Sequence, residues 1–175
     1  IKYDRYQPEF YEDTKTYINK RTSQKKINIG KKFYNKNAKT IEIISQKFSV
    51  EKNLLLSLMG IETNFGSYLG KMDIISSLAT LSFDKRRSDF FTGELITLLK
   101  LIDNNKVNPI TLYGSWAGAF GNFQFMPSTL KNYAFDFDND GFIDLKSTND
   151  SFASAANYLN KMGWKKNEPC FKKIT

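Results

Sequence analysis

The sequence contains no histidine and a single cysteine, Cys170, among its 175 residues. The absence of histidine excludes the Ser-His-Asp triad, the Cys-His dyad and zinc sites with histidine ligands. One cysteine forms no internal disulfide and builds no cysteine-based metal cluster. Acid–base chemistry in this protein must therefore come from carboxylates, lysine or tyrosine.

Long apolar runs are also missing, because the runs present are short, such as residues 54–56 and 90–91, and fall far short of the roughly 20 residues of a membrane span. Hydrophobic residues still make up 41% of the chain, which is enough for a core. Few segments alternate with period two, whereas apolar residues recur at helical spacing. The sequence therefore predicts a globular, mainly α-helical protein.

The apolar spacing predicts helices over residues 8–20, 30–48, 49–65, 74–81, 88–104, 127–133 and 151–162. In the third of these, Ser49 is the predicted N-cap and Gly66 the residue that follows the helix. This helix is apolar nearly all round, which predicts a buried central helix. Residues 113–125 and 136–147 are predicted loops.

Acidic residues are absent from residues 14–41, where nine lysines and arginines stand. The rest of the chain holds the other 17 basic residues against all 18 acidic residues and is nearly neutral. Such a basic segment favours polyanions such as nucleic acid, anionic lipid or an anionic cell-wall polymer. A solvated helical face explains the same pattern, and the sequence leaves both interpretations open.

Glu62 is the first candidate for acid–base chemistry. It lies near the end of a predicted helix, beside Met59, Ile61 and Phe65. Apolar neighbours remove water from a carboxyl group and raise its pKa, as a general acid near neutral pH requires. A glutamate that turns outward to solvent is the alternative, which the sequence alone does not exclude.

A run of acidic residues follows the pattern of a calcium-binding loop. Loop positions 1, 3, 5 and 9 are Asp136, Asp138, Asp140 and Asp144, and position 6 is Gly141. Position 12 is Ser147 in place of the usual glutamate, and Asp150 is a candidate for the missing carboxylate. The pattern favours a metal site over a plain acidic turn, because neighbouring carboxylates repel one another without a cation.

Residues 114–124 read GSWAGAFGNFQ and combine small, polar and aromatic side chains. Small residues let a ligand approach the backbone, and aromatic rings offer flat apolar faces to sugars. Tight packing of helices through small residues explains the same composition, so this motif alone is a weak signal.

Taken together, the motifs resemble those of the B-type membrane-bound lytic murein transglycosylases. The matching segments are DRYQPEF (4–10), GIETNFG (60–66), LATLSF (78–83), GEL (93–95), GSWAGA (114–119), QFMPS (124–128), DFDNDG (136–141) and ANYL (156–159). The resemblance covers residues 4–164, and the shared order of the segments makes it specific.

The resemblance implies a lysozyme-like, mainly α catalytic domain with an EF-hand-like metal loop. It implies cleavage of the β-1,4 bond between N-acetylmuramic acid and N-acetylglucosamine in peptidoglycan. Glu62 would protonate the glycosidic oxygen and then act as base toward the muramic acid C6 hydroxyl, giving a 1,6-anhydro product. No second carboxylate is needed, unlike in most glycosidases. Asp73 and Glu94 remain possible carboxylate partners of Glu62, although structural roles are the expectation.

By the same resemblance, Ser115 and Gln124 hold the sugar and the catalytic glutamate, and Tyr158 is a groove residue. The resemblance also implies a stabilising Ca²⁺, with no cofactor for catalysis itself. Its expected ligands are Asp136, Asp138, Asp140, Phe142 and Asp150.

The resemblance predicts a single catalytic domain over residues 1–175, with an N-terminal helical part to about residue 48 and a catalytic core at 49–164. A later Tyr-Asn pair of the family has no counterpart after Trp164, so we expect the C-terminal part of the family core to be absent. A cleft that lacks one wall would weaken activity.

Peptidoglycan strands are the expected partner of a monomeric protein in the periplasm or cell envelope of a bacterium, with envelope attachment left open. Nucleic acid is not expected, since only the basic segment suggests it. Two alternatives stay open. A true lysozyme would need a second carboxylate, and a non-catalytic module would bind peptidoglycan or calcium through a degenerate cleft.

Overall fold

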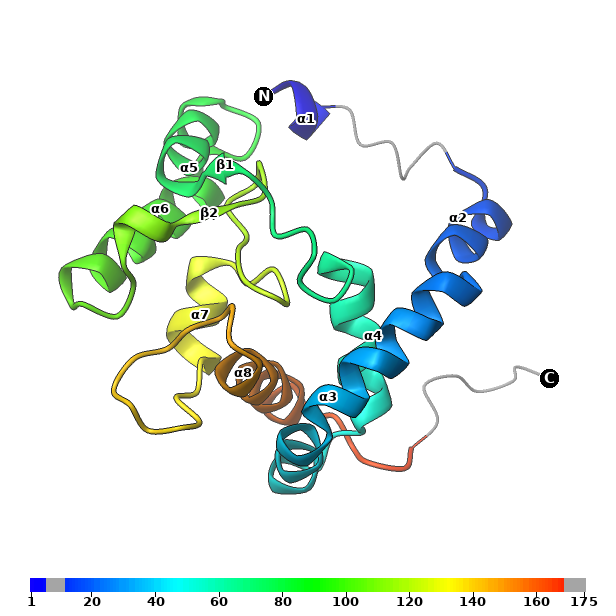
Figure 1. The fold of residues 1–175 in the computed structure, drawn as a ribbon. Coiled ribbons are helices and arrows are strands. Elements are labelled where there is room, and N and C mark those ends of the chain that lie inside the picture. The colour runs from blue at the N-terminus through cyan, green and yellow to red at the C-terminus, as the bar shows by residue number, and fades with distance from the viewer. Residues whose placement is uncertain (6–11, 169–175) are drawn as a thin grey trace.

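The computed structural model describes residues 1–5 and 12–168, and it is mainly helical, as predicted (Figure 1). The elements are α1 (Lys2–Arg5), α2 (Thr14–Arg21), α3 (Gln24–Phe48), α4 (Lys52–Thr63), β1 (Met72–Asp73), α5 (Ile74–Phe83), α6 (Ser88–Asp103), the 3₁₀ turn η2 (Pro109–Thr111), β2 (Tyr113–Gly114), α7 (Pro127–Tyr133) and α8 (Thr148–Lys161). Residues 8–11 of the predicted first helix and residues 6–10 of the DRYQPEF motif lie outside the described residues, as does Cys170.

Two helices begin earlier than predicted because serine side chains cap them. The Ser23 hydroxyl accepts the Lys26 N–H at 3.4 Å, so α3 starts six residues before the predicted position. The Ser147 hydroxyl accepts the Asp150 N–H at 3.1 Å, so α8 starts at Thr148 instead of residue 151. In both helices the cap satisfies an N–H group that has no partner within the helix.

The prediction for the ends of α4 was wrong at both sides. Ser49 does not cap α4; it ends α3 in the left-handed region with φ 55°, and Glu51 takes the N-cap position. At the other end the helix stops at Thr63, and both Asn64 and Phe65 have positive φ, at 50° and 58°. A left-handed phenylalanine is unusual and has to be held by its surroundings.

The core lies between α3, α4 and α8, where Ile41, Ile44, Leu55, Met59 and Phe152 are buried. Helix α5 packs on α6, and α7 contacts both α6 and α8, so α7 joins the two groups of helices (Figure 1). The prediction that α4 is buried all round was wrong. One stripe of α4 enters the core, whereas Ile61 keeps 47% of its surface exposed.

A two-stranded antiparallel sheet brings distant loops together. Met72 of β1 pairs with Gly114 of β2, and Asp73 pairs with Tyr113. The approach next to this pairing is tight, because a Cβ atom on Gly70, at φ +87°, would lie 2.0 Å from the Gly114 carbonyl oxygen. Within the described ranges, no helix is both long and apolar enough to cross a membrane.

Candidate active site

A cleft of about 540 Å³ contains Glu62 and lies between the end of α4 and the paired β1–β2 segments. The residues that line it are Tyr3, Glu62, Tyr68, Gly70, Lys71, Met72, Gly114, Ser115, Trp116 and Gln124. The structure therefore brings together three of the predicted site residues, Glu62, Ser115 and Gln124, from positions far apart in the sequence.

Hydrogen bonds of Thr63 hold the end of α4, and with it Glu62, against the opposite loop. The buried Thr63 hydroxyl lies 2.8 Å from the Asn122 carbonyl oxygen, to which it donates, and it accepts the Gly66 N–H at 3.1 Å. The Asn122 amide in turn donates to the Ser151 hydroxyl on α8 at 3.0 Å. The two sides of the cleft are thus fixed relative to each other by buried polar contacts.

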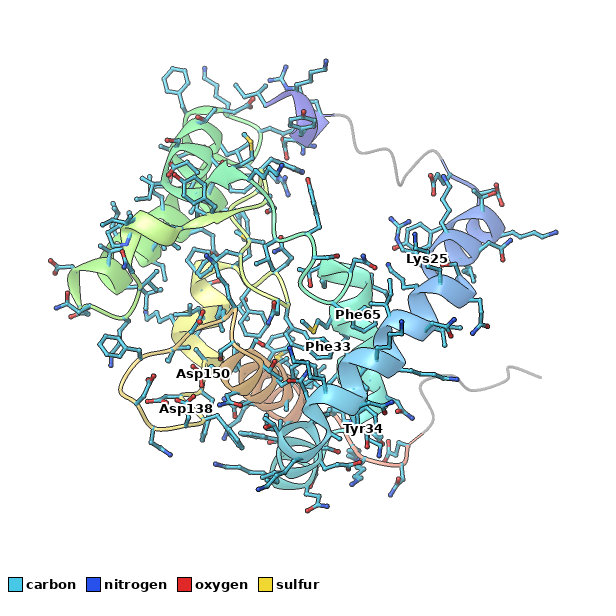
Figure 2. All side chains as sticks on the ribbon, in the orientation of Figure 1. Lys25, Phe33, Tyr34, Phe65, Asp138 and Asp150 are labelled. Carbon is cyan, nitrogen blue, oxygen red and sulfur yellow. The ribbon has the colours of Figure 1, made fainter. Side chains whose placement is uncertain are left out.

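Phe65 fixes the turn that follows Glu62. Its ring tip points between α3 and α4, where Gly30 and Gly60 leave room for it, and a Cβ atom on either glycine would come within 2.8 Å of the ring (Figure 2). The ring also lies 5.9 Å from the ring of Phe33 on α3. This packing is what maintains the left-handed backbone at residue 65 and sets where α4 ends.

Glu62 combines access to solvent with a depleted hydration shell. Its side chain is exposed through the mouth of the cleft, but surrounding protein displaces water, and this desolvation raises the pKa of Glu62. Both sequence interpretations of Glu62 were therefore right in part. The carboxyl group lies in a concave site that is open on one side only, so the surrounding protein still determines its pKa although part of its surface meets solvent.

The loop of residues 114–124 is shaped by its own polar side chains. The Ser115 hydroxyl accepts the N–H groups of Ala117 and Ala119 at 3.3 and 3.0 Å, which curls the loop around it. The Gln124 amide donates to the carbonyls of Leu69 and Gly121 at 3.3 and 3.0 Å. Both predicted residues therefore build the cleft wall as well as face the cleft.

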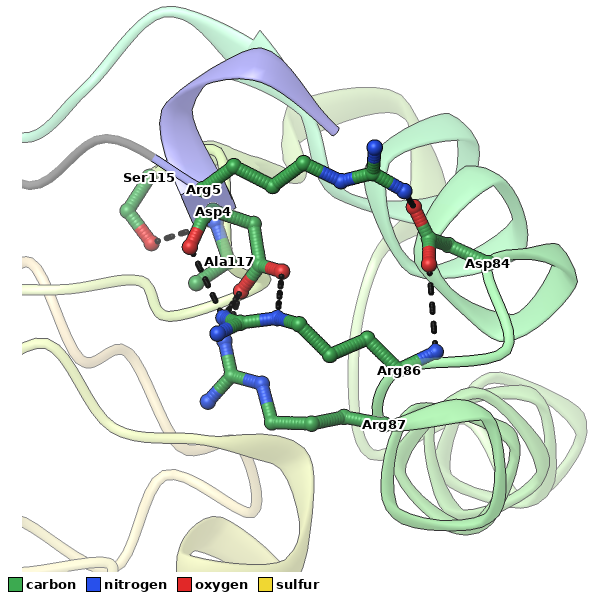
Figure 3. Close-up of polar contacts among 7 residues, drawn as sticks. All are labelled: Asp4, Arg5, Asp84, Arg86, Arg87, Ser115 and Ala117. Carbon is green, nitrogen blue, oxygen red and sulfur yellow. Dashed lines mark hydrogen bonds and ion pairs between the residues drawn. The ribbon is translucent and has the colours of Figure 1, made fainter.

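Tyr3 reaches the cleft because α1 is anchored on the turn between α5 and α6 (Figure 3). The anchor is Asp4, which is only 3% exposed; Arg86 Nε donates to its Oδ2 at 2.7 Å, and Arg87 forms a second ion pair with it. The hydrogen bond from Arg86 is the main reason that the pKa of Asp4 lies below its usual value. A further ion pair joins Arg5 to Asp84 at 2.9 Å.

The two other carboxylates singled out by the sequence are bound to helix ends. Buried Glu94 accepts both the backbone N–H and the hydroxyl of Ser128, at 2.8 and 2.5 Å, in the first turn of α7. Asp73 caps α5 by accepting the Ser76 N–H at 2.7 Å. These contacts fit the structural roles expected of them.

Tyr158 lies apart from the other predicted site residues. It is on α8, where its ring packs edge-on against Tyr133 at 5.1 Å and tilted against Phe125 at 6.0 Å. It does not line the cleft around Glu62 in the part of the chain that the structure describes. Its role as a groove residue stays a prediction.

Sequence reasoning missed Tyr68 and Lys71, which line the cleft from the segment between α4 and β1. Tyr68 is 67% exposed, and an aromatic residue just after the left-handed turn was the available signal. Lys71 gave none, because a lone lysine in a loop is ordinary. Nothing in the sequence indicated that Tyr3 and Met72 line the cleft. Tyr3 is brought there by the ion pairs that anchor α1, and Met72 by the β1–β2 pairing.

The acidic loop between α7 and α8 gathers three carboxylates. One oxygen from each of Asp136, Asp138 and Asp150 lies within 4.8 Å of the others. Asp138 and Asp150 are labelled in Figure 2. Asp150 is buried and accepts the N–H groups of Phe137 and Asp144, both at 2.9 Å. The Oδ1 atom of Asp136 is buried without a hydrogen-bond partner, which is costly unless something else satisfies it.

Two further positions of the calcium-loop pattern lie outside that group of three, and one of them is the predicted ligand Asp140. Asp140 is exposed, and its side chain accepts the Phe142 N–H at 2.8 Å. Ser147, the residue at loop position 12, caps α8. Asp150, placed one helical turn after Ser147, is therefore the carboxylate that closes the group at this end.

Comparisons with known proteins agree with this geometry. The family profile described as "Transglycosylase SLT domain" matches residues 1–175. Membrane-bound lytic murein transglycosylase B of Escherichia coli (strain K12) is 40% identical over 140 residues, 79% of this chain and 39% of the relative.

Two solved structures are similar over most of the chain. SltB3 of Pseudomonas aeruginosa, in complex with NAG-anhNAM-pentapeptide, aligns with a TM-score of 0.87 at 33% identity over 90% of this chain and 42% of its own. The E. coli lytic transglycosylase Slt35, in complex with calcium, gives a TM-score of 0.84 at 37% identity over 88% of this chain and 50% of its own. The chain spans half or less of these relatives, and it belongs to the transglycosylase SLT domain family.

Proposed function

We propose that this chain is a lytic transglycosylase that cleaves the β-1,4 bond between N-acetylmuramic acid and N-acetylglucosamine in peptidoglycan without consuming water. A related protein of Escherichia coli is named membrane-bound lytic murein transglycosylase B, and SltB3 was solved in complex with NAG-anhNAM-pentapeptide, which supports the proposal. Peptidoglycan lies outside the cytoplasm, so we place the protein in the periplasm or envelope of a bacterium.

In the proposed reaction Glu62 acts twice. Protonated Glu62 donates its proton to the glycosidic oxygen as the C1–O bond breaks, and the bonding electron pair leaves with the N-acetylglucosamine O4. The resulting carboxylate then takes the proton of the muramic acid C6 hydroxyl, whose oxygen bonds to C1. The products are a 1,6-anhydro end and a new 4-hydroxyl, and Glu62 regains its proton.

The observation that carries this proposal is that Glu62 is the one carboxylate among the described residues that line the cleft. A hydrolase of the usual kind needs a second carboxylate, either as nucleophile about 5 Å away or as base farther away. The raised pKa of Glu62 suits its first role, because a general acid must hold its proton near the working pH. Ser115 and Gln124 are proposed to position the sugar and Glu62.

Mass spectrometry of digested peptidoglycan tests the proposal. We expect muropeptides one water lighter than hydrolysis products from the wild-type chain, and none from Glu62→Gln. Asp73→Asn is the matched control, because Asp73 follows the cleft residue Met72 in the chain but caps α5, a task that asparagine also performs. Full-mass reducing ends that depend on Asp73 would contradict the proposal and indicate a lysozyme.

We propose further that the acidic loop binds Ca²⁺ through Asp136, Asp138, Asp140, Asp150 and the Phe142 carbonyl. Oxygen donors of this kind suit a hard cation, and a cation would satisfy the buried Asp136 Oδ1 atom. A related structure contains calcium. When bound, the ion supplies charge neutralisation that holds the loop between α7 and α8; it takes no part in the proposed reaction.

Removal of calcium tests this second proposal. We expect EGTA to lower the melting temperature of the wild-type chain and excess Ca²⁺ to restore it, because a ligand that binds the native state stabilises it. Asp136→Asn should abolish the calcium response. The control, Asp103→Asn, removes the same charge from an exposed position at the end of α6, outside the loop, and should keep the response. Equal melting of wild type with and without calcium would refute the site.

A further inference from the structure

A second cavity, of about 340 Å³, opens between α3 and α4; we call it the α3–α4 groove. Helix α4 lines it with residues 53, 56, 57, 60 and 61, which share one face by helical spacing. The floor is Phe65, whose ring tip lies between the two helices. The groove is therefore a built feature of the α3–α4 packing that neither the reaction nor the calcium loop uses.

The walls of the α3–α4 groove are apolar and open to water. Ile27 on α3 and Ile61 on α4 are 43% and 47% exposed, and both face this cavity. One exposed isoleucine is ordinary, but two that flank a concave site over a phenylalanine form a surface that gains free energy when covered. The groove thus suits a ligand with an apolar part.

The rim of the groove is positively charged, and none of the described residues that line the groove is acidic. Arg21 and Lys26 line it, and neither forms an ion pair with any part of the chain that the structure describes. Both lie in the segment 14–41, which contains no acidic residue. Partial burial, and then the charge of Arg21, lower the pKa of Lys26. A bound anion would relieve the repulsion between the two cations.

The groove lies within reach of a ligand bound at Glu62. Ile61 faces the groove, and Glu62, the next residue of α4, faces the cleft. The two openings are therefore separated by about the width of one helix, roughly 10 Å. An extended peptide of five residues spans up to about 17 Å. A peptide attached to a sugar in the cleft is long enough to pass from one opening to the other.

We propose that the α3–α4 groove binds the stem peptide of the peptidoglycan strand held at Glu62, with Arg21 and Lys26 receiving a peptide carboxylate. This inference rests on the proposed function. A stem peptide offers what the groove lacks, namely aliphatic groups for the Ile27 and Ile61 walls and a negative charge for the rim. A lipid surface fits less well, because a bilayer covers a flat or protruding face, whereas this site is a small hollow.

Binding in the catalytically blocked Glu62→Gln protein tests the groove without turnover. The probes are an N-acetylglucosamine–N-acetylmuramic acid disaccharide with a pentapeptide that ends in a free carboxylate, and the same disaccharide without the peptide. We expect the peptide to tighten binding in calorimetry. Adding Lys26→Gln should weaken the peptide-bearing probe about three- to fivefold, as for a partly exposed ion pair, and leave the bare disaccharide unchanged.

The matched control is Lys25→Gln, which removes the same charge from the neighbouring, exposed position of α3 (Figure 2). Lys25 does not line the groove, so Lys25→Gln should bind both probes like its parent. Ile27→Asn tests the apolar wall and should also weaken the peptide-bearing probe alone.

Three results would overturn the inference. The first is equal affinity for the two probes. The second is that Lys25→Gln and Lys26→Gln weaken binding of the peptide-bearing probe equally. The third is that Lys26→Gln binds both probes normally but loses sedimentation with phosphatidylglycerol vesicles. Anhydro products from the wild-type chain are measured separately. Their presence alongside any of these results would refute the groove while keeping the proposed reaction, and their absence would refute the reaction itself.

Discussion

Replacing Gly30 by alanine sets helix propensity against packing. In an ordinary helix interior, alanine is about 1 kcal/mol more favourable than glycine. At residue 30 the new Cβ atom would lie 2.7 Å from Phe65 Cζ, well inside the 3.4 Å at which ordinary contact begins. The ring tip would have to withdraw by about 0.7 Å, and overpacking of this kind costs about 1–3 kcal/mol.

Gly93 provides the matched control for this substitution. It also lies inside a helix, α6, but a Cβ atom there would meet nothing within 4 Å. We therefore expect Gly93→Ala to stabilise the protein by about 1 kcal/mol and Gly30→Ala to leave stability unchanged or lower it by up to about 2 kcal/mol. The gap between the two variants, about 1–3 kcal/mol, isolates the packing cost.

Thermal unfolding followed by circular dichroism measures this gap. For a domain of this size, 1 kcal/mol corresponds to about 2–4 °C, so the melting temperatures of the two variants should differ by about 2–12 °C. Gly60→Ala meets the same ring atom at 2.8 Å, and once the ring has withdrawn, the second alanine should cost less than the first. Equal stabilisation by Gly30→Ala and Gly93→Ala would refute the view that Phe65 is held between α3 and α4.

Three further predictions concern the surroundings of the cleft. Burial raises the pKa of Glu62, so ionising Glu62 costs the native state stability once the pH exceeds the unfolded value of about 4.3. Glu62→Gln removes this cost and should raise the melting temperature by an amount that grows with pH above that value. No gain in melting temperature at pH 8 would contradict the prediction. The lowered pKa of Asp4 has the opposite sign, because its stabilisation is present above about pH 3.9 and is lost as the pH falls through the native value. Asp4→Asn should cost about 1–3 kcal/mol in urea unfolding at pH 7 and less below pH 4, and a deficit independent of pH would count against the ion pairs. Thr63→Val leaves the Asn122 carbonyl and the Gly66 N–H without their partner and should cost about 1–3 kcal/mol in the same assay, more than Thr80→Val at an exposed position.

The sequence predicted those helices whose signals are local. Helices α5, α6 and α7 lie within two residues of their predicted bounds, because apolar stripes and Pro127 mark them directly. The starts of α3 and α8 were missed because their caps, Ser23 and Ser147, stand in segments with another conspicuous property. Ser23 lies among basic residues, and Ser147 lies at the end of an acidic loop. A serine in such a segment fits a solvated loop as well as a helix cap, so the residue type alone did not mark the start of the helix.

The sequence singled out the candidate residue Glu62, but it did not predict the shape of the cleft around it. Glu62 could be found from its apolar neighbours in sequence, and the rise of its pKa follows as expected. The walls of the cleft are positioned by the pairing of residues 72–73 with residues 113–114. These strands have two residues each, which is too short to show an alternating apolar pattern in the sequence. Tyr68 and Lys71 take their place in the cleft from that pairing alone.

Helix α4 shows why an apolar helix is not always a buried one. Leu55 and Met59 enter the core, Glu62 faces the cleft, and Ile61 faces the α3–α4 groove. Apolar residues serve a different purpose on each face of α4. On the core face they pack against α3 and α8, beside the cleft they remove water from the Glu62 carboxyl group, and in the α3–α4 groove they would contact the proposed ligand. A helix that serves three surfaces is apolar all round without being surrounded by protein. On α4 the exposed Ile61 lies beside Glu62 and lines the same groove as Ile27 of α3, so the apolar residue left outside the core belongs to the surface that we propose for the stem peptide.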